Sequence, residues 1–407
     1  MSNKTVRFYT LGCKVNQYET QSIRERFVSR GFKEIFNGRK ADVYLINTCT
    51  VTHKADKDSR YYINKARSQN PKAKVILTGC IACKDKEALS GFKGVDYIIS
   101  KKFFPDGISA FSGHTRAFLK IQDGCDNFCS YCIVPLVRGR SRSRSLKEIV
   151  CEAKRLVSNG FKEIVLTGIC LGAYGKDLRP KADLTDVIPE LEKIIGLLRI
   201  RLSSIEPNYV SDKLIKQILE SKKLCRHLHI PLQSGYDEIL KKMHRRYKSG
   251  DYMKLIKKIK KNIPDIAITT DVLVGFPGEK EENFKNTLKL IREINPLKLH
   301  IFPYSGREGT FATDNFKQAI NPIVMKERIL QIKSLSEKCA IIYKRQFLGK
   351  NMLIFIESCS KNKIGFYRGY TDNYIDVLIK SKQDLRNKLI PLTLKKICDG
   401  SILTYFS

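Results

Sequence analysis

Six short apolar segments alternate with amphipathic helical patterns between residues 117 and 302 of this 407-residue chain. They read AFLKI, EIVLTGI, RIRLSSI, LHIPL, AITTDVLVGF and LKLHIF, and the helical patterns between them include Leu146–Ser158 and Asp212–Ser221. Strands that alternate with helices form parallel sheets whose faces are covered by the helices. Six successive units predict an incomplete (β/α)6 barrel rather than an open sheet.

The same alternation precedes this region, and a different pattern follows it. The segments VRFYTLG, ADVYLINTC, KVILTGC and VDYIIS predict four strands of an N-terminal parallel α/β sheet. After a long helical pattern at Pro322–Phe347, the segments NMLIFIES, KIGFYRGYT and NYIDVLIK predict a small β-barrel. The chain is too long for one ordinary core. We therefore expect an α/β protein of three domains, at residues 1–112, 113–345 and 346–407.

Three cysteines stand within eight residues directly after the first strand of the expected barrel, in IQDGCDNFCSYC. Cys125, Cys129 and Cys132 therefore lie at the C-terminal ends of parallel strands, where functional sites gather. Thiolates bind zinc or iron–sulfur clusters. A structural zinc site has four ligands, and no fourth Cys or His follows nearby. The spacing favours a 4Fe–4S cluster with one open iron, and zinc is the alternative.

A second set of cysteines follows strands of the N-terminal region. Cys13, Cys49 and Cys80 each come at or just after a strand end, so we expect the three to meet at one edge of that sheet. Cys83 could replace or assist Cys80, or form a redox pair with it. Any one of these cysteines could instead be a small apolar side chain packed in the core. We expect such a packing role for the remaining cysteines, Cys151, Cys225, Cys339, Cys359 and Cys398.

The C-x3-C-x2-C spacing, with the aromatic Tyr131 before its third cysteine, resembles the radical S-adenosylmethionine (SAM) superfamily. The stretches TLGCKVNQYET, RGRSRSR, LTGICLGAYG, SSIEP, HIPLQSG and DVLVGFPGE resemble, in order, the methylthiotransferase family, and the C-terminal segment resembles its RNA-binding TRAM domain. The stretch around Cys13 resembles the branch that acts on N6-threonylcarbamoyladenosine in tRNA. The resemblance covers nearly the whole chain.

This resemblance implies a set of cofactors and partners. Two 4Fe–4S clusters would be held by Cys13, Cys49 and Cys80 and by Cys125, Cys129 and Cys132. Two SAM molecules would serve each turnover, one as methyl donor and one as radical source. The reaction would place a methylthio group on C2 of adenosine 37 of tRNA. It also requires a reducing electron donor of the flavodoxin or ferredoxin type and a sulfur source.

Weaker candidates border the expected SAM site, and the sequence singles out no catalytic acid or base. Gly168 and Gly172 would let the backbone approach the methionine end of SAM, and a plain turn is the alternative. Glu206 would accept hydrogen bonds from the ribose, or else form a salt bridge at the rim. Gln233 and Asp271 face the same barrel mouth by position. Three interpretations stay open for Arg138, Arg140, Arg142 and Arg144. They could form a solvated basic loop, contact the SAM carboxylate, or contact RNA phosphate.

The charge of the chain favours a nucleic-acid partner. Its 75 Lys and Arg exceed its 41 Asp and Glu, which gives a net charge of +34. Such an excess favours polyanions. In the C-terminal segment, aromatic and charged residues could stack on bases and contact phosphates, or the aromatic ones could pack in the core. They are Phe366, Tyr367, Arg368, Tyr370 and Tyr374. We see no membrane span or signal peptide and expect a cytoplasmic protein. The rival functions are a sister enzyme acting on isopentenyladenosine or a ribosomal-protein aspartate, and a metal-containing RNA-binding protein without enzymatic activity.

Overall fold

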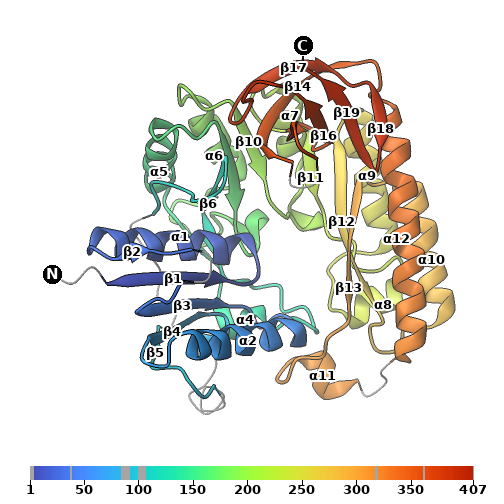
Figure 1. Ribbon diagram of the computed structural model, residues 1–407. Coiled ribbons are helices and arrows are strands. Elements are labelled where there is room, and N and C mark those ends of the chain that lie inside the picture. The colour runs from blue at the N-terminus through green and yellow to red at the C-terminus, as the bar shows by residue number, and fades with distance from the viewer. Residues whose placement is uncertain are drawn as a thin grey trace.

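The computed structural model describes residues 4–36, 39–83, 92–99, 107–316, 320–360 and 363–406. An N-terminal sheet, a half-open barrel and a C-terminal β unit make up the molecule (Figure 1). The α/β fold class is confirmed. No helix in these ranges combines the length and the apolar composition that a bilayer-spanning segment requires.

The N-terminal unit is a parallel five-stranded sheet of order β2-β1-β3-β4-β5. Its strands are β1 (Thr5–Thr10), β2 (Lys33–Glu34), β3 (Val43–Thr48), β4 (Lys74–Gly79) and β5 (Tyr97–Ile98). Its helices are α1 (Lys14–Ser29), α2 (His53–Gln69) and the short η1 (Ile81–Cys83). All six residues of β3 are buried, as expected for a central parallel strand. The four predicted strands are present, whereas β2 was missed because two residues carry no periodicity.

Six parallel strands form the middle unit in the order β6-β9-β10-β11-β12-β13. They are β6 (Arg116–Lys120), β9 (Glu163–Thr167), β10 (Arg199–Leu202), β11 (His227–His229), β12 (Ala267–Val274) and β13 (Lys298–Pro303). Two three-stranded sheets are joined by the isolated parallel bridges Ile200–Leu224 and Ser204–His229. The strands β6 and β13 stand at the two edges, so the barrel is open between them. The predicted incomplete barrel is therefore confirmed.

Helices cover the outer face of the barrel and shorter elements cover its rim (Figure 1). The outer helices are α5 (Leu146–Ser158), α6 (Leu184–Glu192), α7 (Asp212–Glu220), α9 (Ser249–Asn262), α10 (Glu281–Ile294) and α12 (Pro322–Arg345). The rim elements are β7 (Gln122–Asp123), α4 (Val134–Arg138), β8 (Arg142–Ser143), η2 (Leu171–Ala173), η3 (Pro207–Tyr209), α8 (Asp237–Lys242) and α11 (Phe311–Asn315). Helix α5 begins where the sequence predicts, because Ser145 and Glu148 form a capping box.

The C-terminal unit is a six-stranded mixed sheet of order β17-β14-β15-β16-β19-β18. Its strands are β14 (Asn351–Cys359), β15 (Phe366–Thr371), β16 (Asp376–Lys380), β17 (Leu389–Thr393), β18 (Lys396–Cys398) and β19 (Ser401–Tyr405). The last three strands were not predicted. This unit closes the N-terminal end of the barrel, since the Arg199 guanidinium donates to the carbonyls of Tyr370 (2.8 Å) and Leu353 (2.7 Å).

Two C-terminal tyrosines take part in this closure. Tyr374 stacks on Tyr370 at 5.1 Å, and the guanidinium of Arg201 lies 4.5 Å from the Tyr374 ring centre. Both half-buried rings therefore pack on or beside the barrel, which favours the core-packing alternative for them. Arg368 is exposed and keeps the alternative of RNA contact, as do the half-buried Phe366 and Tyr367. The TRAM assignment stays a prediction.

The domain boundaries also stay predictions. Helix α12 ends at Arg345, where the second boundary is expected. Ile108 and Phe111, from the end of the expected first domain, are buried in the core that the barrel and its helices share. The N-terminal sheet and the barrel are thus joined through a packed segment.

Candidate functional site

The loop that carries Cys125, Cys129 and Cys132 lies over the C-terminal ends of the barrel strands. Backbone hydrogen bonds hold it at both ends, from Cys125 N to Gly139 O (3.1 Å) and from Ser130 N to Met243 O (3.1 Å). Tyr131 packs edge-on against Phe276 with ring centres 6.3 Å apart. The aromatic residue before the third cysteine therefore anchors the loop in an apolar pocket and leaves the thiols at the barrel mouth.

The three thiols of this loop lie in different surroundings. Burial raises the pKa of the Cys132 thiol to about 12. Burial also raises the pKa of Cys129, against the effect of Arg245, whose Nη1 donates to the Cys129 sulfur at 3.2 Å. A hydrogen bond with the Cys170 thiol lowers the pKa of Cys125 instead, although burial opposes it. A bound cation stabilises the thiolate form of all three, so the loop is suited to metal ligation.

Cys13, Cys49 and Cys80 gather at the C-terminal edge of the N-terminal sheet. They follow the neighbouring strands β1, β3 and β4. The charges of Cys80 and Cys13 both act on Cys49, although burial is the main cause that raises the pKa of Cys49 to about 11. The sequence prediction that three separate loops meet here agrees with this placement.

The Cys83 alternative can be compared with Cys80 in the structure. Cys80 is buried, whereas Cys83 is half-buried and its sulfur donates to the carbonyl of Gly79 at 3.6 Å. Cys80, and not Cys83, is among the charges that act on Cys49. These contacts favour Cys80 as the third ligand of the set.

Neither set of three cysteines has the compact geometry of a single-ion site. In the described ranges, three metal-ligand atoms lie within 4.8 Å of one another at His229, Asp271 and His300, and at no cysteine set. Zinc with sulfur at 2.3 Å would hold its thiolates about 3.8 Å apart. The wider spacing suits a cluster of several irons. The two cysteine sets therefore fit the implied 4Fe–4S clusters better than zinc.

Two glycines allow the N-terminal cysteines to approach one another. Gly12 has φ +91°, and a Cβ there would lie 2.8 Å from the Cβ of Cys49. Gly79 has φ +98°, and a Cβ there would lie 2.3 Å from the carbonyl oxygen of Thr48. A side chain at either position would separate loops that must meet.

We expect Gly12→Ala to lose the N-terminal cluster selectively. The added methyl collides with Cys49, so that iron and sulfide in the anaerobically purified protein should fall by about half, the other cluster remaining. The matched control is Gly31→Ala, because Gly31 has φ +84° with nothing within 4 Å of its Cβ position. Equal iron contents in the two variants would contradict the steric explanation.

The arginines that follow the cysteine loop are not equivalent. Arg138 and Arg144 are buried, and their side chains form ion pairs: Arg138 with Glu19 and Asp123, Arg144 with Glu152. Contact with SAM or RNA, and a solvated loop, are therefore wrong for these two residues. Arg140 and Arg142 are exposed, and both alternatives stay open for them.

The candidate SAM-site residues lie around the same barrel mouth. Glu206 forms an ion pair with Arg245, as the salt-bridge alternative predicted. Burial, above all, raises the pKa of Glu206 against the effect of Arg245, and the charge of Asp271 raises it too. Gln233 has φ +64°, and its N–H donates to the Asp271 carbonyl at 2.8 Å. The sequence positions that we singled out are thus brought together, but their contact with SAM stays a prediction.

Gly168 and Gly172 both lie where another side chain approaches the backbone. A Cβ on Gly168 would be 2.8 Å from Gln122 Oε1, and a Cβ on Gly172 would be 2.3 Å from the Cβ of Tyr209. Gln122 Oε1 also accepts from Cys170 N at 2.8 Å. Both glycines therefore permit close packing under the cysteine loop.

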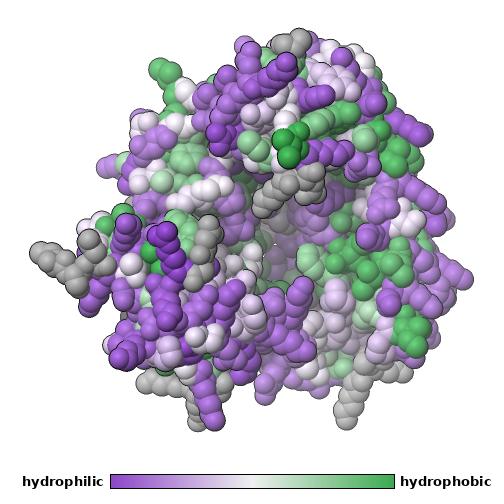
Figure 2. Space-filling view, in the orientation of Figure 1, coloured by the Kyte–Doolittle hydropathy of each residue, from purple (hydrophilic) through white to green (hydrophobic). Residues whose placement is uncertain are grey.

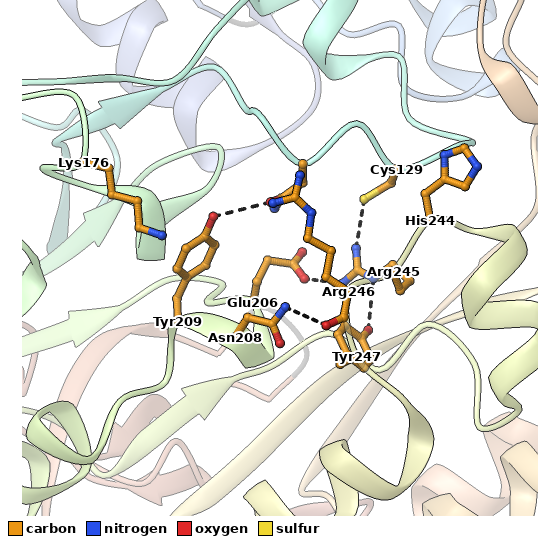
Figure 3. A pocket seen from close by; sticks show the side chains of 10 residues that line it. Cys129, Lys176, Glu206, Asn208, Tyr209, His244, Arg245, Arg246 and Tyr247 are labelled. Carbon is orange, nitrogen blue, oxygen red and sulfur yellow. Dashed lines mark hydrogen bonds and ion pairs between the residues drawn. The ribbon is translucent and has the colours of Figure 1, made fainter.

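A cavity opens beside Cys129 (Figure 3). Its volume is about 150 Å³, and it is partly open to solvent. Arg245 stands between Cys129 and Glu206 and bonds to both, while Lys176 lies over the Tyr209 ring at 4.1 Å. The cavity is lined by Asn127, Cys129, Lys176, Glu206, Asn208, Tyr209, His244, Arg245, Arg246 and Tyr247. The cavity thus has the candidate cluster ligand Cys129 and several cationic and polar groups in its wall.

Sequence reasoning missed Arg245, His229 and His300. Arg245 lies in a loop without a motif, so no pattern identifies it. The two histidines had a usable signal, because each stands at an alternate, inward-facing position of a strand that is otherwise apolar.

Comparisons with protein families and curated relatives agree with this site. Residues 119–291 match the radical SAM superfamily, and residues 5–100 match the uncharacterized protein family UPF0004. The threonylcarbamoyladenosine tRNA methylthiotransferase MtaB of Bacillus subtilis (strain 168) is 39% identical over 96% of this chain and 94% of its own. The tRNA-2-methylthio-N(6)-dimethylallyladenosine synthase of Carboxydothermus hydrogenoformans is 33% identical over 99% and 98%.

Solved structures resemble the fold at low sequence identity. The radical S-adenosylmethionine methyltransferase TsrM from Kitasatospora setae, with cobalamin and a [4Fe-4S] cluster bound, aligns with a TM-score of 0.54 at 14% identity. That match covers 74% of this chain and 75% of the other. It concerns the fold alone.

Proposed function

Because this chain belongs to the radical SAM methylthiotransferase family, we propose that it methylthiolates tRNA, converting N6-threonylcarbamoyladenosine at position 37 to its 2-methylthio derivative. The curated relatives with the higher identities, 39% and 36%, carry the threonylcarbamoyladenosine name. Relatives that carry the dimethylallyladenosine name are 32–35% identical. The sister activity on isopentenyladenosine is the alternative.

The observation that carries this proposal is that α4 connects the two cysteine sets. Helix α4 begins two residues after Cys132, and its Val137 packs in one cluster with Cys80 and Ile133. The charges of Cys80 and Cys13 act on Arg138 at the end of this helix. The two cysteine sets, which lie on two different sheets, are thus neighbours, and this supports a reaction that uses both.

We propose that Cys125, Cys129 and Cys132 hold the cluster that binds SAM, and that Cys13, Cys49 and Cys80 hold the second cluster. When bound, these clusters supply the electron that cleaves SAM and the sulfur of the methylthio group. Arg245 donates to the Cys129 sulfur, and such a hydrogen bond tunes a cluster ligand. Glu206, held by Arg245, borders the cavity in which SAM would lie. We propose that Gly168, Gly172 and Gln233, outside the cavity lining, also contribute to the SAM site.

The chain itself orients the substrate and excludes water. The C-terminal unit closes one end of the barrel, so a base can enter only through the mouth or through the gap between β6 and β13. A nucleotide in a single-stranded loop leaves its stack at low cost. The net charge of +34 favours a polyanion. We propose a cytoplasmic enzyme supplied by a flavodoxin or ferredoxin type of donor and by a cellular sulfur source.

The test is expression of this chain in a bacterial strain that makes N6-threonylcarbamoyladenosine in tRNA but lacks its methylthio derivative. We expect the methylthio nucleoside to appear when bulk tRNA is digested and analysed by mass spectrometry. A Cys129→Ala chain is the matched control and should give none. Appearance of the methylthio-isopentenyl nucleoside instead would reassign the enzyme to the sister branch, and no methylthio nucleoside at all would refute the proposal.

A further inference from the structure

The interior of the barrel is lined by polar side chains. Along β11, His227 and His229 point inward while Leu228 packs in the core beneath the helices. The same alternation places Thr269 and Asp271 of β12 inside and Ile268 outside, and His300 of β13 inside and Leu299 outside. Barrels of this kind are normally filled by branched apolar residues. A polar interior indicates a polar occupant.

The lower part of this interior is already occupied by the C-terminal unit. The Tyr374 ring lies 4.7 Å from the ring of His227, and the Arg201 guanidinium donates to the Asp372 carbonyl at 3.0 Å. Above them, the side chains of His229, Asp271 and His300 are 12%, 20% and 43% exposed. This layer is therefore the deepest one that a ligand can reach. Figure 2 shows the face hollowed near its middle, on the side of β12 and β13.

Asp271 holds the two histidines of this layer in place. Its Oδ1 lies 3.0 Å from His229 Nε2 and 3.2 Å from His300 Nδ1. The two rings stack with centres 5.1 Å apart. Both histidine contacts lower the pKa of Asp271 although burial opposes them. Asp271 is thus a carboxylate that accepts from both rings through one oxygen.

A chain of hydrogen bonds fixes the tautomer of His229. Thr269 Oγ1 lies 2.9 Å from both His227 Nε2 and His229 Nδ1. His227 Nδ1 is buried without a partner among the described residues, so a proton there would cost a desolvated N–H. The proton therefore sits on His227 Nε2 and donates to Thr269. The Thr269 hydroxyl then donates to His229 Nδ1, and His229 Nε2–H donates to Asp271.

In this tautomer His229 uses both ring nitrogens within the layer. The three polar atoms of His229, Asp271 and His300 lie within 4.8 Å of one another and form one hydrogen-bonded set. Two polar atoms of this layer remain for a ligand. Asp271 Oδ2 has no partner among the described residues, and the His300 ring contacts Asp271 through Nδ1, so its Nε2 is left for a ligand. They form a polar pair ready for a hydrogen-bonding ligand.

We propose that Asp271 and His300 bind the N6 substituent of the substrate adenine and select a hydrogen-bonding substituent over a hydrocarbon. This rests on the proposed function. Asp271 and His300 stand three residues before the ends of β12 and β13, about 10 Å below the rim that carries the cysteines. With C2 facing the rim, the substituent on C6 extends in a different direction and can reach this layer.

The chemistry of the two known substituent classes explains the selection. A threonylcarbamoyl group brings N–H groups, a hydroxyl and a carboxylate, which match an acceptor oxygen and an imidazole that donates when charged and accepts when neutral. An isopentenyl group offers none of these and would leave both polar groups unpaired. Covering these polar groups with a hydrocarbon removes their water without giving them a partner, which weakens binding. His229, which contacts Asp271 and not the opening, is a positioning residue.

The test measures binding of anticodon stem-loop RNAs to the anaerobically purified holoprotein by fluorescence anisotropy. The RNAs carry threonylcarbamoyladenosine, isopentenyladenosine or plain adenosine at position 37. We expect the chain to prefer the first RNA, and His300→Leu to weaken that binding about 10- to 100-fold while binding of plain RNA stays unchanged. His114→Leu is the matched control, because His114 is also exposed and its ring contacts Phe111 and Phe118.

Each outcome decides one of the two proposals. If the unaltered chain prefers the threonylcarbamoyl RNA and His300→Leu keeps that preference, the binding layer is refuted and the proposed function stands. If the unaltered chain prefers the isopentenyl RNA, both substrate assignments fall. The layer would also be refuted as the site of the N6 substituent if His300→Leu weakened the binding of all three RNAs equally. A matching loss of SAM affinity in this variant would refute it as well.

Discussion

Cys129→Ala will abolish reductive cleavage of SAM, whereas Cys49→Ala will keep that cleavage and lose the methylthio product. The two residues lie in separate cysteine sets on separate sheets, so each substitution removes one ligand from one cluster. A cluster that loses one of three thiolates is not retained. The expected effect is a complete loss in each case, but of different steps.

Both variants are measured with threonylcarbamoyl-containing tRNA and a chemical reductant, by following 5′-deoxyadenosine and the methylthio nucleoside. The matched control is Cys151→Ala, because Cys151 is an exposed cysteine on α5. It should retain both products. If Cys49→Ala formed methylthiolated tRNA at the normal rate, the N-terminal cysteines would not be the sulfur site. If Cys129→Ala still cleaved SAM, the ligand assignment of the barrel loop would be wrong.

The strands that carry chemistry could be predicted from the sequence because they are parallel and buried. The central strands β3 and β4 contain the apolar runs VYLI and VIL, and Cys49 and Cys80 follow their ends. The edge strand β2 has two residues, and the last three strands of the C-terminal unit have three to five, with Pro391 inside β17. Their pairing depends on neighbours distant in the chain, so local patterns do not reveal it.

The contacts that organise the site were less predictable, because they join residues far apart in the sequence. Arg245 contacts Cys129 across 116 residues, and Tyr374 packs on Arg201, which belongs to another unit. A sequence pattern shows which residues are basic or aromatic but not which of them are paired. Arg138 and Arg144, which we weighed as SAM or RNA contacts, are instead buried in ion pairs, and Tyr370 and Tyr374 are half-buried against the barrel.

Arg138→Ala will lower the free energy of unfolding by about 3–5 kcal/mol, because it leaves buried carboxylates without their main partner. The Arg138 side chain is 1% exposed, and its Nη1 donates to Glu19 Oε1 at 3.1 Å and to Asp123 Oδ1 at 2.8 Å. Glu19 belongs to α1 and Asp123 to β7, so this arginine joins the N-terminal sheet to the barrel loop. Lys120 also pairs with both carboxylates, at 3.0 and 2.6 Å, which favours the lower end of the range.

The same arginine connects the junction to the N-terminal cysteines. Its Nη2 donates to Asn16 Oδ1 at 2.6 Å, and the Cys13 sulfur lies 3.8 Å from that same oxygen. Urea unfolding followed by circular dichroism, with iron content measured in parallel, should therefore show lower stability and a weakened N-terminal cluster together. Arg140→Ala is the matched control, since the Arg140 side chain is 75% exposed and its pair with Asp126 is worth about 1 kcal/mol at most. Equal unfolding free energies for the two variants would mean that the buried network does not hold the two sheets together.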